Sequence, residues 1–193
     1  NSLWQKVEFG NFHKTIVKTE LLELILNRGC KSLKFSYSTI LGSLCLDEKS
    51  QLRELQLSDC DKNIEVWEEI LASCYSLQKL ELPEVTMTPK MATSICQNGK
   101  TLQTLNLYCC HGDRTSYLQI IKYCQELKEV DLLCSFCGYS GLSNDNLEFL
   151  AKHISPNVEI LNLSNNYVTN DNVEILLSRC KKIKILDLGD TSI

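Results

Sequence analysis

The sequence is poor in the residues on which most enzymes and membrane proteins depend. It contains three histidines, four arginines, three prolines and two methionines among its 193 residues. No apolar run approaches the length of about 18 residues that a transmembrane helix requires. It has no glycine-rich phosphate-binding loop, and no Ser or Cys lies in a glycine-flanked strand-to-helix turn. We therefore expect a protein that is not an enzyme, binds no cofactor and does not cross a membrane.

The net charge of the chain argues against a nucleic-acid partner. The net charge of −4 is small and negative, whereas nucleic-acid-binding domains usually carry a concentrated basic patch. The first residues also lack the basic and apolar regions of a secretion signal. We expect neither a nucleic-acid nor a membrane partner.

Leucine, by contrast, recurs at a fixed interval. The first leucine of an L-x-x-L-x-L pattern lies at Leu52, Leu77, Leu102 and Leu127, which are steps of 25 residues. The pattern continues at Val158 and Ile183 after steps of 31 and 25 residues, and a weaker copy opens at Cys30. This period and this pattern are typical of the leucine-rich repeat.

The repeat predicts an α/β solenoid shaped as a horseshoe arc. Each repeat should supply a short strand to a parallel sheet on the concave face and a helix to the convex face. Residues 30–193 should hold about seven strands, the last repeat being incomplete. Residues 1–29 should form an N-terminal linker or cap with one helix. We expect a longer protein to continue beyond both ends, and the domain to be a monomer.

Two helix starts are marked in the sequence. Thr88 followed by Pro89 predicts an N-cap with proline at the first helical position. Asn170 followed by Asp171 predicts another N-cap.

The eleven cysteines fit the same repeat. Cys60 and Cys110 occupy the ninth position of their repeats, where the pattern accepts Asn or Cys. Cys74, Cys124 and Cys180 end helical segments. Placed in this way, each behaves as a small buried apolar residue. We therefore expect reduced thiols and a cytoplasmic and/or nuclear protein.

One cysteine cluster allows a different interpretation. Cys134 and Cys137 form a C-x-x-C pair, and Cys109, Cys110 and His111 lie at the corresponding turn of the preceding repeat. Cys and His ligands at this spacing suit zinc, and a C-x-x-C pair also suits redox chemistry. The repeat pattern accounts for Cys110 without a ligand, so we predict no metal site and no redox activity.

Alternation along each strand assigns three columns of side chains to the concave face. The first column is Glu54, Lys79, Thr104, Glu129, Ile160 and Ile185. The second is Gln56, Glu81, Asn106, Asp131, Asn162 and Asp187. The third is Ser58, Pro83, Tyr108, Leu133, Ser164 and Gly189.

These columns hold five carboxylates and one lysine, which favours a protein partner with a basic segment. Charge needed only for solubility would give the same excess. An insertion at residues 133–142 adds aromatic side chains beside Tyr108 and Leu133, and exposed aromatics often anchor interfaces. The predicted partner-binding residues are Glu81, Asn106, Tyr108, Glu129, Asp131, Leu133, Phe136, Tyr139 and Asn162.

Cysteines at the ninth position and at the helix end resemble the cysteine-containing leucine-rich repeats of F-box proteins. The string from Ser2 to Phe9 (SLWQKVEF) is similar to the segment that joins an F-box to the first repeat. The strings from Gly29 to Phe35 and from Ile70 to Leu80 are similar to the S-phase kinase-associated group of that family.

This resemblance implies a protein-recognition domain, namely the substrate-binding repeats of a ubiquitin-ligase receptor. The family contacts the ligase adaptor through the F-box, which this sequence does not contain. The alternative is a free-standing leucine-rich-repeat scaffold or inhibitor without a ligase link.

Overall fold

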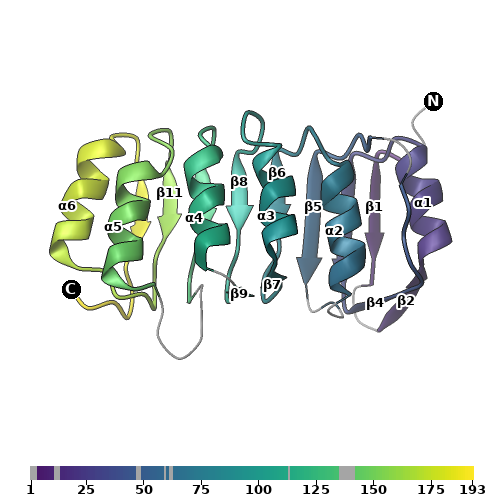
Figure 1. The fold of residues 1–193 in the computed structure, drawn as a ribbon, viewed down its shortest axis with the longest axis horizontal. Coiled ribbons are helices and arrows are strands. Elements are labelled where there is room, and N and C mark those ends of the chain that lie inside the picture. Colours follow the sequence, from purple (N-terminus) through teal and green to yellow (C-terminus); the bar gives the residue numbers. More distant parts are fainter. Residues whose placement is uncertain are drawn as a thin grey trace.

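A single parallel sheet runs through the computed structural model, which describes residues 4–10, 14–46, 49–58, 60, 63–112, 114–134 and 142–193. Its eight strands lie in the order β1-β3-β5-β6-β8-β10-β11-β12 (Figure 1). They are β1 (Lys6–Phe9), β3 (Ser32–Ser36), β5 (Glu54–Ser58), β6 (Lys79–Glu81), β8 (Thr104–Asn106), β10 (Glu129–Asp131), β11 (Ile160–Asn162) and β12 (Ile185–Asp187). All seven strands expected in residues 30–193 are present at the predicted repeats.

The helices cover one face of this sheet and follow one another along it (Figure 1). They are α1 (Thr19–Asn27), α2 (Ile64–Ser73), α3 (Pro89–Cys96), α4 (Arg114–Tyr123), α5 (Asn144–His153) and α6 (Asn170–Arg179). Each helix from α2 to α6 contacts the next. The predicted leucine-rich-repeat solenoid is confirmed. Within the described residues, no helix has the length and apolar character needed to cross a bilayer.

The N-terminal part differs from the expected pattern in two ways. Strand β1, which was not predicted, pairs in parallel with β3 and extends the sheet. The expectation that every repeat carries a helix is wrong for the stretch between β3 and β5, where the described residues form β4 (Ser38–Leu41) and coil. Strand β4 pairs with β2 (Thr15–Lys18), and buried Ile40 and Leu44 fill the core there. A second small sheet joins β7 (Thr86–Met87) to β9 (His111–Gly112).

The repeat leucines form the core between the sheet and the helices. The opening residues Leu52, Leu77, Leu102, Leu127 and Val158 are fully buried. The fourth and sixth positions of the strands are buried as well, as at Leu105 and Leu107. Burying one leucine side chain contributes about 1.5–3 kcal/mol. Because each repeat covers its apolar side only with its neighbours, the order of the stack depends on every repeat.

The eighth position of the repeat adopts an unusual backbone conformation. A positive φ between 48° and 59° occurs at Tyr37, Glu84, Cys109, Cys134, Asn165 and Asp190. Each of these residues lies seven after the opening residue of its repeat. Left-handed backbone is unfavourable for residues other than glycine, although Asn and Asp tolerate it. The solenoid therefore imposes the same turn on these six repeats, whichever side chain is present.

The ninth position, directly after this turn, connects neighbouring repeats. The Cys110 thiol donates a hydrogen bond to the Leu82 carbonyl at 2.7 Å. The Asn166 amide donates the equivalent bond to the Leu132 carbonyl at 3.0 Å and also accepts one from the Leu142 N–H at 3.1 Å. Leu82 and Leu132 both occupy the sixth position of the preceding repeat. At a third ninth position, the Cys60 thiol donates to the Ser58 carbonyl of its own repeat at 3.3 Å. Cys and Asn both suit this position because both side chains can donate to a main-chain carbonyl.

The two predicted helix starts had different outcomes. The Thr88 hydroxyl accepts a hydrogen bond from the Met91 N–H at 3.1 Å, which confirms this N-cap and Pro89 at the first helical position. The prediction of Asn170 as the other cap is wrong, because Asn170 is the first residue of α6. Thr169 is the cap, and its side chain and that of Asn172 form a reciprocal capping box. Thr and Asn are both favoured N-cap residues, so the sequence does not distinguish Thr169 from Asn170 as the cap.

Replacing the ninth-position amide should show how much this connection stabilises the stack. Asn166→Ala leaves the Leu142 N–H and the Leu132 carbonyl without a side-chain partner. We expect a loss of about 1–3 kcal/mol in the free energy of unfolding. Asn166→Cys restores a donor of the Cys110 type and should recover part of that loss. Urea unfolding measures both changes, with exposed Asn170→Ala as the control. Equal destabilisation by Ala and Cys would contradict this role of the ninth position.

Candidate functional site

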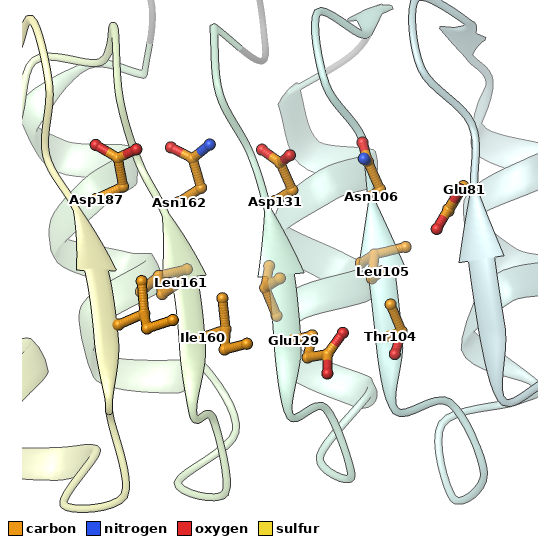
Figure 2. A pocket seen from close by; sticks show the side chains of 12 residues that line it. Glu81, Thr104, Leu105, Asn106, Glu129, Asp131, Ile160, Leu161, Asn162 and Asp187 are labelled. Atoms are coloured by element: carbon orange, nitrogen blue, oxygen red, sulfur yellow. The ribbon is translucent and has the colours of Figure 1, made fainter. Parts of the chain in front are cut away.

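The face of the sheet opposite the helices, here called the open face, is the surface that the sequence predicted to be concave. Four equivalent fifth-position residues of adjacent repeats form a row across it: Asn106, Asp131, Asn162 and Asp187 (Figure 2). We call these four residues the Asx row. They stand in register because β8, β10, β11 and β12 pair without offset.

Every side chain of the Asx row is held by its own backbone. The Oδ1 atoms of Asn106 and Asp131 accept hydrogen bonds from the N–H groups of Tyr108 and Leu133 at 2.8 and 3.0 Å. Those of Asn162 and Asp187 accept from Ser164 and Gly189, both at 3.0 Å. Such local bonds fix the side-chain orientation before any ligand arrives.

The third-position residues form a parallel row of mixed character. They are Thr104, Glu129 and Ile160 (Figure 2), together with Ile185, which pairs with Ile160 on the neighbouring strand. The side chains of Ile160 and Ile185 are 36% and 56% exposed. Two neighbouring isoleucines thus face solvent next to the carboxylates of the Asx row, and the open face combines apolar and acidic surface.

The two rows, together with Glu81, line a shallow cavity of about 310 Å³. None of its lining residues is a lysine or arginine. Glu81 pairs with Lys79 at 2.9 Å on the neighbouring surface. For Glu129, Asp131 and Asp187, the described part of the chain supplies no ion-pair partner. The cavity therefore presents carboxylates whose charge is not compensated.

The two carboxylates of the Asx row are in different electrostatic environments. Burial raises the pKa of Asp131, and the charges of Asp187 and Glu81 raise it further, while the bond from the Leu133 N–H acts in the opposite direction. The pKa of Asp187 is lowered by hydrogen bonds from the Gly189 N–H and the Ser164 hydroxyl. A bound cation would relieve the repulsion at Asp131, because opposite charge favours the ionised carboxyl.

Five of the predicted partner-binding residues lie together in this cavity. These are Glu81, Asn106, Glu129, Asp131 and Asn162. Tyr108 and Leu133 are half-buried in the turns after β8 and β10, outside the cavity lining. Phe136 and Tyr139 fall outside the described residues. The cavity thus contains the acidic part of the predicted site, and the Tyr108–Leu133 pair borders it.

Seven lining residues were not in the predicted set. Three of them are the buried core residues Leu105, Val130 and Leu161. The other four are Thr104, Ile160, Ile185 and Asp187. Strand alternation had assigned all four to exposed columns. The isoleucines were passed over because Tyr108 and Leu133 were predicted to form the apolar part of the site. An isoleucine in an exposed column, where other repeats carry Glu, Lys or Thr, is the sequence feature that could have identified them.

The cysteine cluster proves to be divided among different environments. Cys110 is buried in the core, whereas Cys109 and Cys134 lie half-exposed in adjacent turns. Cys137 lies outside the described residues. Within the described ranges all cysteines are reduced, and no three potential ligands gather where they could hold a metal ion. The part of the structure that is described therefore supplies no metal centre.

A sheet of stacked parallel strands with helices on one face and a shallow open face defines a leucine-rich-repeat domain, a class built for recognising other proteins. The comparison with protein families agrees. Residues 20–193 match the family of the SKP2 LRR domain, and the chain belongs to that family. A search of curated proteins gave no match. The protein is thus a protein–protein recognition repeat domain of the type that the resemblance to F-box proteins implied.

The opposite shifts of Asp131 and Asp187 predict opposite effects of pH on two equivalent variants. Because the pKa of Asp131 is raised, its ionised form destabilises the fold at neutral pH. Asp131→Asn should therefore be more stable than the parent at neutral pH, with the difference vanishing as the pH falls towards the ordinary Asp value of about 3.9. The parent Asp187, with its lowered pKa, stabilises the fold above that value and loses this contribution as the pH falls through the lowered pKa.

Urea unfolding of both variants at neutral pH and near pH 4 tests the sign for Asp131→Asn, and a further measurement well below the ordinary Asp value of about 3.9 tests it for Asp187→Asn. Asn keeps the Oδ1 acceptor in each variant, as Asn106 and Asn162 show. A stability loss at neutral pH for Asp131→Asn would contradict the account of the cavity's electrostatics.

Proposed function

We propose that the open face binds a basic segment of a partner protein, and that the domain forms the substrate-binding repeats of an F-box ubiquitin-ligase receptor. The observation that carries the proposal is the cavity in which Glu129, Asp131 and Asp187 lie uncompensated beside exposed Ile160 and Ile185. The hydrogen bonds that hold the side chains of the Asx row to their own backbone reduce the conformational entropy lost on binding.

The chemistry of this surface favours a partner of mixed character. Lysine or arginine side chains would meet the carboxylates, and the aliphatic stem of the same side chains would cover the isoleucines, because long basic side chains are apolar along most of their length. Complementary charge mainly accelerates association, whereas buried apolar contacts mainly slow dissociation. Tyr108 and Leu133 are proposed as the anchors at the edge of this surface.

The ligase role rests on the family to which the chain belongs. The name of that family is the SKP2 LRR domain, and the resemblance to F-box proteins implies that such repeats select substrates. A receptor of this kind needs an extended surface with separate sites for partner and adaptor. The open face, which the stacked repeats hold rigid, supplies such an extended surface.

Variants of the open face separate the charged from the apolar contribution. The binding partner is first captured with the full-length protein and identified by mass spectrometry, and its affinity is then measured by biolayer interferometry. Glu129→Gln combined with Asp131→Asn should slow association roughly tenfold and weaken its dependence on salt. Ile160→Ala with Ile185→Ala should mainly speed dissociation. Tyr108→Ala should cost about 2 kcal/mol or more of binding free energy.

The matched control lies on the helical face. Glu148→Gln with Glu174→Gln removes the same number of charges from α5 and α6 and should leave binding unchanged. Binding that survives all open-face changes, but is lost on the helical face, would disprove the proposed site.

The ligase link has its own test. The full-length protein should co-purify with the ligase adaptor, whereas residues 20–193 alone should not. Equal failure of both to capture the adaptor would favour the free-standing scaffold or inhibitor, with the open-face binding site unaffected.

A further inference from the structure

Two thiols that the leucine-rich fold does not require lie side by side at the edge of the open face. Cys109 and Cys134 both occupy the eighth position of adjacent repeats, and both have a φ of 48°. The strands before them pair in register, with Asn106 opposite Asp131. The Cys109 N–H donates a hydrogen bond to the Leu133 carbonyl at 3.0 Å, so the two turns remain adjacent beyond the strands.

This geometry suits a covalent bond between the two sulfur atoms. Equivalent Cα atoms of adjacent strands lie about 4.8 Å apart, within the range of about 4.4–6.8 Å that a disulfide spans. Burial raises the pKa of the Cys109 thiol, the Cys134 thiol is close enough to raise it further, and the neighbouring Tyr108 hydroxyl acts in the opposite direction. Both cysteines are partly exposed, so a small oxidant can reach them.

We propose that Cys109 and Cys134 form a dithiol site that a peroxide converts reversibly into a disulfide. One thiolate attacks the O–O bond of hydrogen peroxide and becomes a sulfenic acid, and the departing hydroxide is protonated to water. The second thiolate then attacks the sulfenic sulfur, the S–S bond forms, and the oxygen leaves as a second water after protonation. In total, two thiols and one peroxide give one disulfide and two waters, and a dithiol reductant reverses the reaction.

The chain contains an internal comparison for this reaction. Cys96, the last residue of α3, and Cys124, directly after α4, form a second pair of thiols that influence each other's pKa. Cys124, however, is completely buried, and its pKa is raised by the Cys96 thiol and by burial. Neither thiolate formation nor peroxide access is favourable at Cys124. We therefore expect peroxide to oxidise Cys109 and Cys134, and the pair of Cys96 and Cys124 to stay reduced.

The pH dependence of the reaction follows from the surroundings of Cys109. Burial raises the pKa of its thiol, and Cys134 and Glu84 add to this effect, while the Tyr108 hydroxyl opposes it. The reacting species is the thiolate. Bond formation should therefore be slow at neutral pH and accelerate as the pH rises.

Oxidation also affects the neighbouring surface. A bond between the two turns would link the segments that carry Tyr108 and Leu133 and would remove the Cys109 thiol that Tyr108 contacts. The chemical proposal is independent of partner binding, because disulfide formation is measured on the domain alone.

Mapping of the oxidised protein tests the proposal. The purified domain is treated with a small excess of hydrogen peroxide, blocked with N-ethylmaleimide and digested with trypsin. The expected product joins the peptides of residues 101–114 and 129–152 and disappears on reduction. These peptides also contain Cys110 and Cys137, so variants must assign the bond. Cys109→Ser and Cys134→Ser should each abolish it, whereas Cys137→Ser should keep it.

A second measurement needs no variant. Phenylarsine oxide bridges adjacent thiols, and it should protect both Cys109 and Cys134 of the reduced parent from N-ethylmaleimide. A bond that persists in Cys109→Ser, a bond that requires Cys137, oxidation to sulfinic acid without a cross-link, or the absence of arsenical protection would overturn the proposal.

Discussion

The stacking of repeats in register is the constraint on which the rest of the molecule depends. No repeat can bury its own apolar side, because one short strand and one helix of at most ten residues enclose too little volume. Leu52, Leu77 and Leu102 are fully buried because each lies against the equivalent residues before and after it. The fixed step of 25 residues keeps these leucines aligned. Although the step between Leu127 and Val158 is longer, β10 and β11 still pair in register.

The same register organises the polar surface. Because Leu105 must lie beside Val130, Asn106 must lie beside Asp131, so the Asx row is a consequence of core packing. The turn that follows is equally constrained, since its eighth residue is left-handed and its ninth reaches back to the preceding repeat. The repeat period of the sequence therefore sets both the packing of the core and the arrangement of the polar surface. The apolar positions hold the stack together, and the positions between them are free to define what the open face recognises.

The sequence predicted those features that follow from periodicity. Strand positions, the buried fourth and sixth residues, the acidic column and the capping Thr88 were all predicted, because each depends on local chemistry or on the repeat itself. Strand β1 was missed because residues 6–9 carry no leucine of the repeat pattern, although β1 pairs with β3 of the first recognised repeat. The absent helix before β5 and the cap at Thr169 were missed because tertiary packing decides between local choices of similar energy. Ile160 and Ile185 were missed although alternation placed them in an exposed column, because the apolar part of the site was assigned to Tyr108, Leu133 and the inserted aromatic residues.

The central claim is that the open face, with exposed isoleucines beside uncompensated carboxylates, receives the partner. Methyl NMR of the domain with labelled isoleucine δ1 groups tests it directly, because Ile160 and Ile185 lie in the cavity while Ile120 is buried on α4. Titration with the basic segment of the captured partner should shift the Ile160 and Ile185 resonances and leave that of Ile120 unchanged. Shifts confined to isoleucines on the helices, such as Ile175 on α6, would show that the partner binds elsewhere and would contradict the account.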